Sequence, residues 1–206
     1  MDIENLPYTK VYIVDDEAPL RKALELLTRS VQLKAKSYAS AQEFLDDYHP
    51  GAPACLVVDV RMPGISGIEL VERLHALQAP ISTIVMTGHG DIPMTVRAMK
   101  AGALDVIEKP FKNQVLLDLL QRGLEKSTKE ARLRAKRECA RARLARLTPR
   151  EREVFELILD GTRNKTIADK LKLSTRTVEL HRARVMEKAE AVSLSDLLQL
   201  ASMALT

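Results

Sequence analysis

The chain has 206 residues, enough for one large domain or two small ones, and we expect two. A hydrophobic share of 46% and a charged share of 29% are typical of a globular protein. No apolar run reaches the roughly 20 residues that span a bilayer, so no membrane partner is expected. The acidic start MDIEN lacks a signal-peptide pattern, and two cysteines give neither a disulfide framework nor a zinc spacing. We therefore expect a cytoplasmic protein.

Charge is distributed unevenly along the chain. Residues 1–126 contain 14 Lys and Arg against 17 Asp and Glu, a formal charge of −3, whereas residues 127–206 contain 18 against 11, a formal charge of +7. The second part is therefore the one expected to meet a polyanion. Aromatic residues make up only 3% and Trp is absent, which disfavours base stacking on single-stranded nucleic acid.

The first part of the chain alternates short β-type runs with amphipathic stretches. The β-type runs predict strands at 10–16, 34–38, 55–59, 81–87 and 104–109. The amphipathic stretches predict helices at 16–31, 41–48, 66–77, 93–101 and 113–126. This order predicts an α/β fold, a doubly wound, flavodoxin-like sheet of five parallel strands with helices on both faces. Ligands of such sheets bind beyond the carboxyl ends of the strands.

The second part of the chain reads as helical throughout. Residues 127–147 hold 8 basic and 2 acidic residues without Pro or Gly, which predicts a solvated helical linker. Thr148, Pro149 and Glu151 form a helix start with a capping box, and Gly161 is expected to end that helix. Further helices are predicted at 164–171, at 175–189 and from 195. We expect a domain at 1–126, a basic linker at 127–147 and an all-α helix-turn-helix domain at 148–206.

Polar residues stand where the predicted strands end. Asp15 and Asp16 end the first strand, Asp59 the third, Thr87 the fourth and Lys109 the fifth. Three carboxylates within a few ångströms of one another oppose burial unless a cation is present, and Mg²⁺ accepts such oxygen ligands. A carboxylate nucleophile beside a metal, a lysine and a hydroxyl can accept a phosphoryl group. Each of these residues alone is more often a turn former, a helix cap or a surface residue. Their occurrence at the ends of successive strands favours a phosphoryl-accepting site.

The motifs VDDE, DVRMPGISG, MTGHGD and KPF resemble the receiver domain of two-component response regulators, particularly the FixJ-like type. The resemblance implies that a sensor histidine kinase phosphorylates Asp59, and that Asp15, Asp16, Asp59 and the backbone carbonyl of Arg61 hold Mg²⁺ or Mn²⁺. It also implies that Thr87 is the switch residue, that Lys109 contacts the phosphate through a cis bond to Pro110, and that Arg61 and His89 tune the phosphoryl lifetime.

Two further features of the sequence bear on the predicted site, the residue at position 106 and the turn after the third strand. Many receivers pair the switch threonine with an aromatic residue on the fifth strand, where this chain has Val106, so coupling must use smaller side chains. The turn RMPG after the third strand is expected to open the sheet rim, so that Asp59 faces solvent.

The predicted helix 175–189 has an apolar inner face and a charged outer face. Val178, Val185 and Ala189 face inward, and an outward Leu180 can contact a thymine methyl in the major groove. The candidate DNA-binding residues are Arg176, Thr177, Glu179, Leu180, His181, Arg182, Ala183, Arg184 and Lys188. Basic groups among them are expected to contact phosphates. A charged solvent face is the ordinary alternative for such a helix, and the capping pattern and basic linker favour DNA.

The motifs LTPRE, NKTIA and STRTVELHRARVMEK are similar to the LuxR/NarL-type helix-turn-helix. This resemblance implies base reading at the positions of Glu179, Leu180 and Ala183, and dimerisation through the last helix. Together the two likenesses imply a transcription regulator, not an enzyme, whose phosphorylation promotes homodimerisation and binding to double-stranded promoter DNA, with RNA polymerase as a further partner.

Two alternatives stay open at this point. One is a DNA-binding regulator that works without phosphorylation and uses its first domain as a dimer scaffold. The other, less favoured, is a Mg²⁺-dependent phosphotransferase with an aspartyl-phosphate intermediate. Such an enzyme needs a general acid or base two residues after the nucleophile, and Arg61 stands there.

Overall fold

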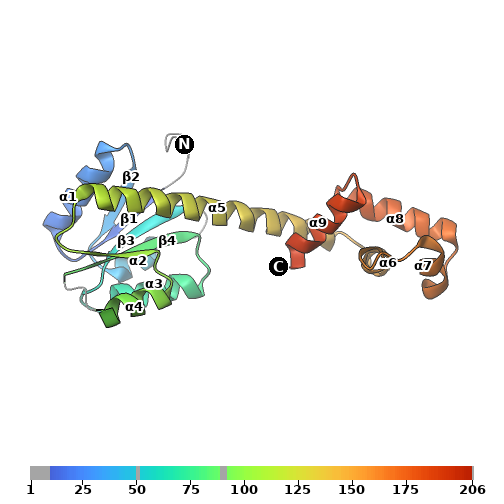
Figure 1. The fold of residues 1–206 in the computed structure, drawn as a ribbon, viewed down its shortest axis with the longest axis horizontal. Helices are drawn as coiled ribbons and strands as arrows, with labels where there is room; N and C mark the ends of the chain where they lie inside the picture. Colours follow the sequence, from blue (N-terminus) through green and yellow to red (C-terminus); the bar gives the residue numbers. More distant parts are fainter. Residues whose placement is uncertain (1–9, 50–51, 89–91, 206) are drawn as a thin grey trace. The chain divides into compact units, whose positions relative to one another are not determined.

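The computed structural model describes residues 10–49, 52–88 and 92–205, with the side chain of residue 205 left out. The chain divides into two compact units, Met1–Arg132 and Leu133–Thr206 (Figure 1). Within the described ranges, no helix is both long and apolar enough to cross a membrane.

The first unit is built on one sheet of five parallel strands in the order β2-β1-β3-β4-β5, which confirms the predicted fold class (Figure 1). The strands are β1 (Lys10–Val14), β2 (Lys34–Tyr38), β3 (Ala54–Asp59), β4 (Ile81–Thr87) and β5 (Asp105–Glu108). The bounds of β2 and β4 match the prediction, and the others differ by one or two residues. All six residues of the central β3 are buried, because both of its faces are covered.

Five helices surround this sheet: α1 (Ala18–Ser30), α2 (Ala41–Asp47), α3 (Gly67–Ala76), α4 (Ile92–Ala101) and the first part of α5 (Asn113–Ala145). Alternate residues of β3 point to two separate cores. Leu56 and Val58 pack in the core that α2, α3 and α4 cover. Cys55 and Val57 pack in the core that α1 and α5 cover. This alternation explains the continuous apolar run before Asp59.

The second unit contains the end of α5 and four further helices, α6 (Pro149–Leu159), α7 (Asn164–Leu171), α8 (Thr175–Ala189) and α9 (Leu194–Leu205). The capping box predicted from sequence is present, since the hydroxyl of Thr148 and the carboxylate of Glu151 each accept from the other's backbone N–H. Its core includes Leu144 and Leu147, which fall in the segment expected to be a solvated linker, and Ala140 of the same segment is also buried.

A tight connection joins α7 to α8. Lys172 ends α7 in the left-handed conformation with φ 53°, and the hydroxyl of Ser174 caps α8 by accepting from the N–H of Thr177. The two helices pack through Ile167 and Ala168 of α7 and Val178 of α8, all buried. Together they form the helix-turn-helix that the sequence predicts.

Candidate functional site

The carboxyl ends of the strands bring the predicted polar residues to one rim of the sheet. Asp15 directly follows β1, Asp59 ends β3, Thr87 ends β4 and Lys109 directly follows β5. Backbone hydrogen bonds hold these ends together, because the N–H of Lys109 donates to the carbonyl of Thr87 at 2.7 Å and that of Val60 to Met86 at 2.9 Å. Topology therefore makes neighbours of residues that lie far apart in the chain.

The ammonium group of Lys109 joins two carboxylates. Its Nζ donates to Asp15 Oδ2 at 2.8 Å and to Asp59 Oδ1 at 2.6 Å. The three side chains are 18%, 0% and 10% exposed for Lys109, Asp15 and Asp59 respectively. Burial by itself lowers the pKa of Lys109, but the hydrogen bonds and charges of both carboxylates outweigh it and raise that pKa above its ordinary value. Lys109 is therefore held in its charged form.

Backbone N–H groups bind the remaining carboxylate oxygens. Asp15 Oδ1 accepts from the N–H of Glu17 at 2.8 Å, and Asp59 Oδ2 accepts from the N–H of Arg61 at 2.7 Å. The guanidinium of Arg21 donates to the backbone carbonyl of Asp15 at 2.7 Å. Asp59 is thus covered by Lys109 and tied to its own loop, so the expectation that it faces solvent is wrong. The reason is that Lys109 and the N–H of Arg61 bind its two oxygens, and Asp59 as a whole residue is only 7% exposed.

Close packing at the start of α3 fixes the backbone beside Asp59. A Cβ placed on Gly67 would lie 2.1 Å from the carbonyl oxygen of Asp59, which no side chain tolerates. The N–H of Gly67 donates to the carbonyl of Val60 at 3.1 Å. The glycine of the ISG sequence therefore lets the helix approach the strand end closely and hold the phosphoacceptor candidate in place.

Asp16 lies apart from the two buried carboxylates. It is exposed and lines a groove of about 790 Å³ between the β3–α3 loop and the first turns of α4. Further residues lining this groove include Arg61, Met62, Pro93, Met94 and Arg97. Among residues 10–49, 52–88 and 92–205, no three His, Cys, Asp or Glu side chains are close enough to form a metal site. The expectation of three closely grouped carboxylates is therefore wrong, because Asp16 points outward.

The remaining donor set still fits Mg²⁺. This ion is usually bound through one or two carboxylates with waters and a phosphate, and Asp15 and Asp59 are near enough to share one ammonium. Three aspartates with one lysine carry a net charge of −2 around the rim, which a divalent cation would neutralise. The N–H bond to Asp59 also fixes the peptide of Arg61 beside that carboxylate.

Thr87 is buried at the end of β4. Its hydroxyl donates to the sulfur of Met94, in the first turn of α4, at 3.5 Å. Val106, at the position where many receivers carry an aromatic residue, is half-buried and pairs with Val85 on the neighbouring strand. The peptide bond from Lys109 to Pro110 is cis, as the resemblance implied. His89, predicted to tune the site, lies outside the described residues.

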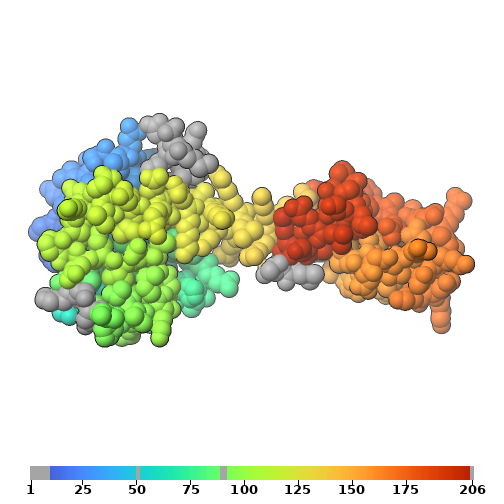
Figure 2. Space-filling view, viewed as in Figure 1, coloured from blue at the N-terminus to red at the C-terminus, as the bar shows by residue number. Residues whose placement is uncertain are grey.

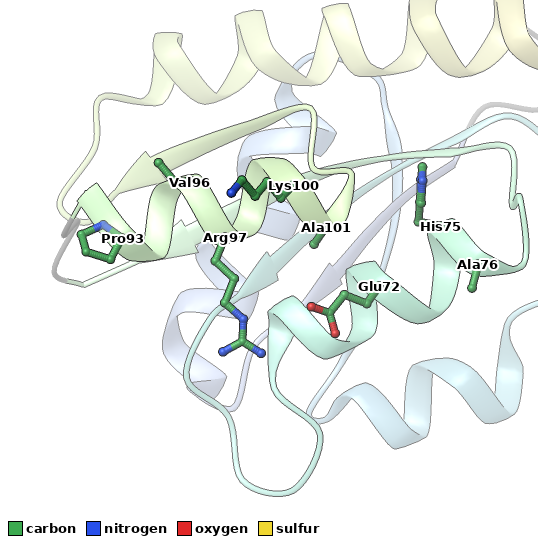
Figure 3. Close-up of a pocket in the computed structure, with 8 residues that line it drawn as sticks. All are labelled: Glu72, His75, Ala76, Pro93, Val96, Arg97, Lys100 and Ala101. Carbon is green, nitrogen blue, oxygen red and sulfur yellow. The ribbon is translucent and has the colours of Figure 1, made fainter.

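A second groove, of about 620 Å³, lies between α3 and α4 (Figure 3). The side chains of Glu72 on α3 and Arg97 on α4 point into the space between the two helices (Figure 3). Pro93 and Arg97 line both this groove and the one beside Asp16. The first turns of α4 therefore border both grooves.

α8 lies at the surface of the second unit (Figure 2), and the residues on its outer face are mostly polar. Exposed residues on it include Arg176, Glu179, Leu180, Ala183 and Arg184, and the side chain of Leu180 is 51% exposed. Thr177, His181 and Arg182 are half-buried at its edges. The inner face agrees with the predicted periodicity, because Val178, Val185 and Ala189 are buried.

Lys188 has a different partner from the one the sequence suggested. Its ammonium donates to Glu151 Oε2 at 2.6 Å, and the carboxylate side chain of Glu151 is only 3% exposed. The hydrogen bond to Lys188, followed by that to the N–H of Thr148, lowers the pKa of Glu151 to about 2. Lys188 thus binds the capping box of α6.

Several contributors to the rim had no signal in the sequence pattern. Glu17 and Arg21 look like ordinary residues at the start of α1, yet their backbone and side-chain groups bind Asp15. Met94 looks like one apolar position of an amphipathic helix, yet its sulfur contacts Thr87. Only spatial contacts reveal these roles, because residue type and spacing at each position are ordinary.

Comparison with known proteins agrees with the fold. Residues 11–121 match the response regulator receiver domain, and residues 145–201 match the luxR family of bacterial regulatory proteins. The chain is 44% identical to the transcriptional regulatory protein FixJ of Azorhizobium caulinodans, over 98% of this chain and 94% of that protein. It is 43% identical to nodulation protein W of Bradyrhizobium diazoefficiens, over 92% and 84%.

A solved structure extends the likeness to three dimensions. The response regulator StyR is 40% identical, with a TM-score of 0.86 over 94% of this chain and 98% of that one. The protein is thus a response regulator with a receiver domain and a LuxR-type DNA-binding domain. Within that class it belongs to the FixJ-like transcriptional regulators, which confirms the family predicted from sequence.

Family membership fixes the general kind of partner. Response regulators of this type work with a sensor kinase and with DNA, and their receiver domains generally use Mg²⁺. The family is one of transcription regulators, which are not normally enzymes.

Proposed function

We propose that Asp59 is the phosphoacceptor of this regulator and that its phosphorylation promotes binding to promoter DNA. The observation that carries the proposal is the shared ammonium: Lys109 lies between Asp59 and Asp15 at 2.6 and 2.8 Å. Asp59 is thereby a carboxylate with a cation already beside it, where an incoming phosphoryl group needs charge neutralisation.

The transfer begins at an oxygen of Asp59 that Lys109 or the N–H of Arg61 binds in this structure. An oxygen of Asp59 attacks the phosphorus of a phosphohistidine in the sensor kinase, the bond from phosphorus to the imidazole nitrogen breaks, and its electron pair leaves with the imidazole. The product is an acyl phosphate. Lys109 would then bind one phosphoryl oxygen and the hydroxyl of Thr87 would donate to another.

Mg²⁺, or Mn²⁺ in its place, would be held by Asp15, Asp59 and the backbone carbonyl of Arg61. When bound, the cation would neutralise charge on the phosphoryl oxygens. Lys109 already neutralises part of the charge of Asp15 and Asp59 without it.

The outer face of α8 would read DNA. We assign base contacts to Glu179, Leu180 and Ala183, and phosphate or edge contacts to Arg176, Thr177, His181, Arg182 and Arg184. Exposure of the central positions supports this assignment. Lys188 was expected among the DNA contacts, but we assign it to stability, because its ammonium is bound to Glu151.

Homodimerisation on phosphorylation would join two such modules on a two-fold DNA site. Apolar side chains on two helices suit this step: Ile92, Val96 and Met99 of α4 are exposed, as are Leu194 and Leu198 of α9. A regulator bound at a promoter would also meet RNA polymerase. Action on promoter DNA would place the protein in the bacterial cytoplasm.

The test uses the full chain with acetyl phosphate and Mg²⁺. Phosphorylation is read by intact mass, and DNA affinity by fluorescence anisotropy on a duplex selected from a random library by the phosphorylated protein. We expect wild type to gain one phosphoryl group and a higher affinity, and Asp59→Asn to gain neither. Asp118→Asn is the matched control, because this aspartate is exposed on α5.

Each alternative predicts a different outcome of that experiment. Equal DNA affinity of Asp59→Asn and phosphorylated wild type would replace the proposal with a phosphorylation-independent regulator. Sustained turnover of a phosphate ester with Mg²⁺ would instead favour the phosphotransferase. Arg61 is exposed and stands where such an enzyme needs its acid or base, which argues against turnover.

A further inference from the structure

We propose that Met94 couples the phosphorylation of Asp59 to α4, as a positioning residue that acts through Thr87. The inference rests on the proposed function and concerns the step after phosphorylation. Its basis is one contact: the buried hydroxyl of Thr87 donates to the sulfur of Met94 at 3.5 Å.

The partner of the Thr87 hydroxyl changes when Asp59 carries a phosphoryl group. A thioether sulfur is a weak hydrogen-bond acceptor, whereas a charged phosphoryl oxygen is a strong one. The hydroxyl therefore turns from Met94 toward the phosphoryl oxygen, and its contact with the sulfur of Met94 is lost. The phosphorylation state of Asp59 thereby changes the position of a side chain on α4.

Met94 can respond because of where it lies. It is half-buried against the core on the α3 and α4 side of the sheet, and it also lines the groove of about 790 Å³ beside Asp16 and Arg61. Methionine has three rotatable side-chain bonds and adapts to irregular spaces. Release from Thr87 lets the side chain move within that groove without opening the core.

Val106 is poorly suited to the same task. Its partner across the sheet is Val85, whereas Thr87 pairs with Glu108 at the end of β5. A β-branched side chain has few rotamers and offers no hydrogen-bonding group that could follow a hydroxyl. Met94 combines a direct contact to Thr87 with freedom to move.

Movement of Met94 reaches the surface through α4. Pro93, immediately before it, and Arg97, one turn after it, both line the groove between α3 and α4 (Figure 3). The same helix exposes Ile92 to 80%, with Val96 and Met99 also exposed. Repacking of the first turn therefore alters the surface that we assign to dimerisation.

The test compares Met94→Leu with Met62→Leu in the full chain. Leucine keeps the apolar volume, an exchange that protein cores tolerate well, but it removes the sulfur acceptor. Met62 lines the same groove from the β3–α3 loop and provides the matched control. The measured quantity is the ratio of DNA affinities with and without acetyl phosphate, together with the rate of phosphorylation.

We expect Met94→Leu to be phosphorylated as wild type is, while the phosphorylation-dependent gain in affinity falls by about tenfold, within the usual range of coupling between sites. Met62→Leu should keep the gain. A full gain in Met94→Leu overturns the inference, and so does loss of phosphorylation, because Met94 would then act in phosphoryl transfer itself. Absence of a gain in wild type would instead overturn the proposed function, so the two failures are distinguishable.

A spectroscopic measurement tests the contact directly. With ¹³C-methyl methionine, each of the seven methionines gives one resonance, and that of Met94 is identified by its absence from Met94→Leu. We expect this resonance to shift on phosphorylation of wild type and to stay unchanged on phosphorylation of Thr87→Val. A Met94 methyl that does not shift in wild type, or that shifts equally in Thr87→Val, overturns the inference.

Discussion

Two buried lysine–carboxylate clusters, one in each unit, use the same chemical groups for different ends. In the first unit, one ammonium, that of Lys109, serves two buried carboxylates, those of Asp15 and Asp59. In the second, the ammonium of Lys188 serves the single carboxylate of Glu151, which also completes a capping box. The first cluster keeps a net negative charge and the second is neutral.

This difference in charge separates a reactive site from a structural one. A cluster with excess negative charge is stabilised when it binds a further cation. Its carboxylates can therefore exchange a hydrogen bond from Lys109 for a bond to that cation. A neutral pair whose carboxylate is also bound by a helix N-terminus has nothing to gain from a further ligand. A buried ion pair therefore indicates function only when its charges are left unbalanced.

The largest effect is expected from Lys109→Met. Without the ammonium, Asp15 and Asp59 repel each other and the incoming phosphoryl group loses a cation, so phosphorylation should slow by at least about 100-fold. The measurement is the rate with acetyl phosphate at saturating Mg²⁺, with the exposed Lys112→Met as control. If Lys109→Met is phosphorylated at the wild-type rate, Mg²⁺ alone supplies the positive charge. The cluster at Lys109 would then not differ in reactivity from the cluster at Lys188.

Lys188→Met should act on stability alone. It leaves the buried carboxylate of Glu151 without its cation, which should lower the free energy of unfolding of the second unit by about 2 kcal/mol. Hydrogen exchange of α6 and α8 measures this effect, and Lys170→Met, on the exposed face of α7, is the control. If Lys188→Met is as stable as the control but binds DNA weakly, Lys188 is a DNA contact after all.

Glu151→Gln should destabilise less, by about 1 kcal/mol at neutral pH, because glutamine also completes a capping box. The pKa of Glu151 is lowered from 4.5 to about 2, so its contribution is fully present above pH 4.5 and is lost as the pH falls toward 2. The difference between wild type and variant should shrink over that interval in thermal unfolding followed by circular dichroism. A difference that is constant with pH would contradict the ion pair.

The smallest effects are expected on the outer face of α8, where charge is not buried. Arg184→Ala should weaken DNA binding by about 1 kcal/mol on every sequence and reduce the salt slope by about one. Leu180→Ala should instead relax the preference among duplexes and leave the salt slope unchanged. Titrations at several salt concentrations separate the two, and identical effects from both variants would contradict the assigned face.

Much of this fold could be predicted from local patterns. The alternation of apolar runs and amphipathic stretches located all five strands to within two residues, and Thr148, Pro149 and Gly161 located the ends of α6. The rim was also predictable, because parallel strands bring their carboxyl ends together. Motifs then identified the family, since four of them stand in order along residues 8–126.

The contacts between side chains were not predictable in the same way. Glu151 and Lys188 lie 37 positions apart in charge-rich helices, where nothing in the pattern separates a buried pair from solvated charges. The burial of Asp59 depends on a lysine 50 positions away. Leu144 and Leu147 lie in a segment dominated by arginine, and the high charge of that segment concealed their part in a hydrophobic core.

The end of α5 has a consequence for how such regulators are recombined. Because Leu144 and Leu147 pack in the core of the second unit, and Arg143 and Arg146 pair with Glu190 at the end of α8, the segment 133–147 is inherited with the output module. A chimera that exchanges receivers should be joined before residue 133. A junction at 148, where the helix-turn-helix motifs begin, would graft an incomplete module.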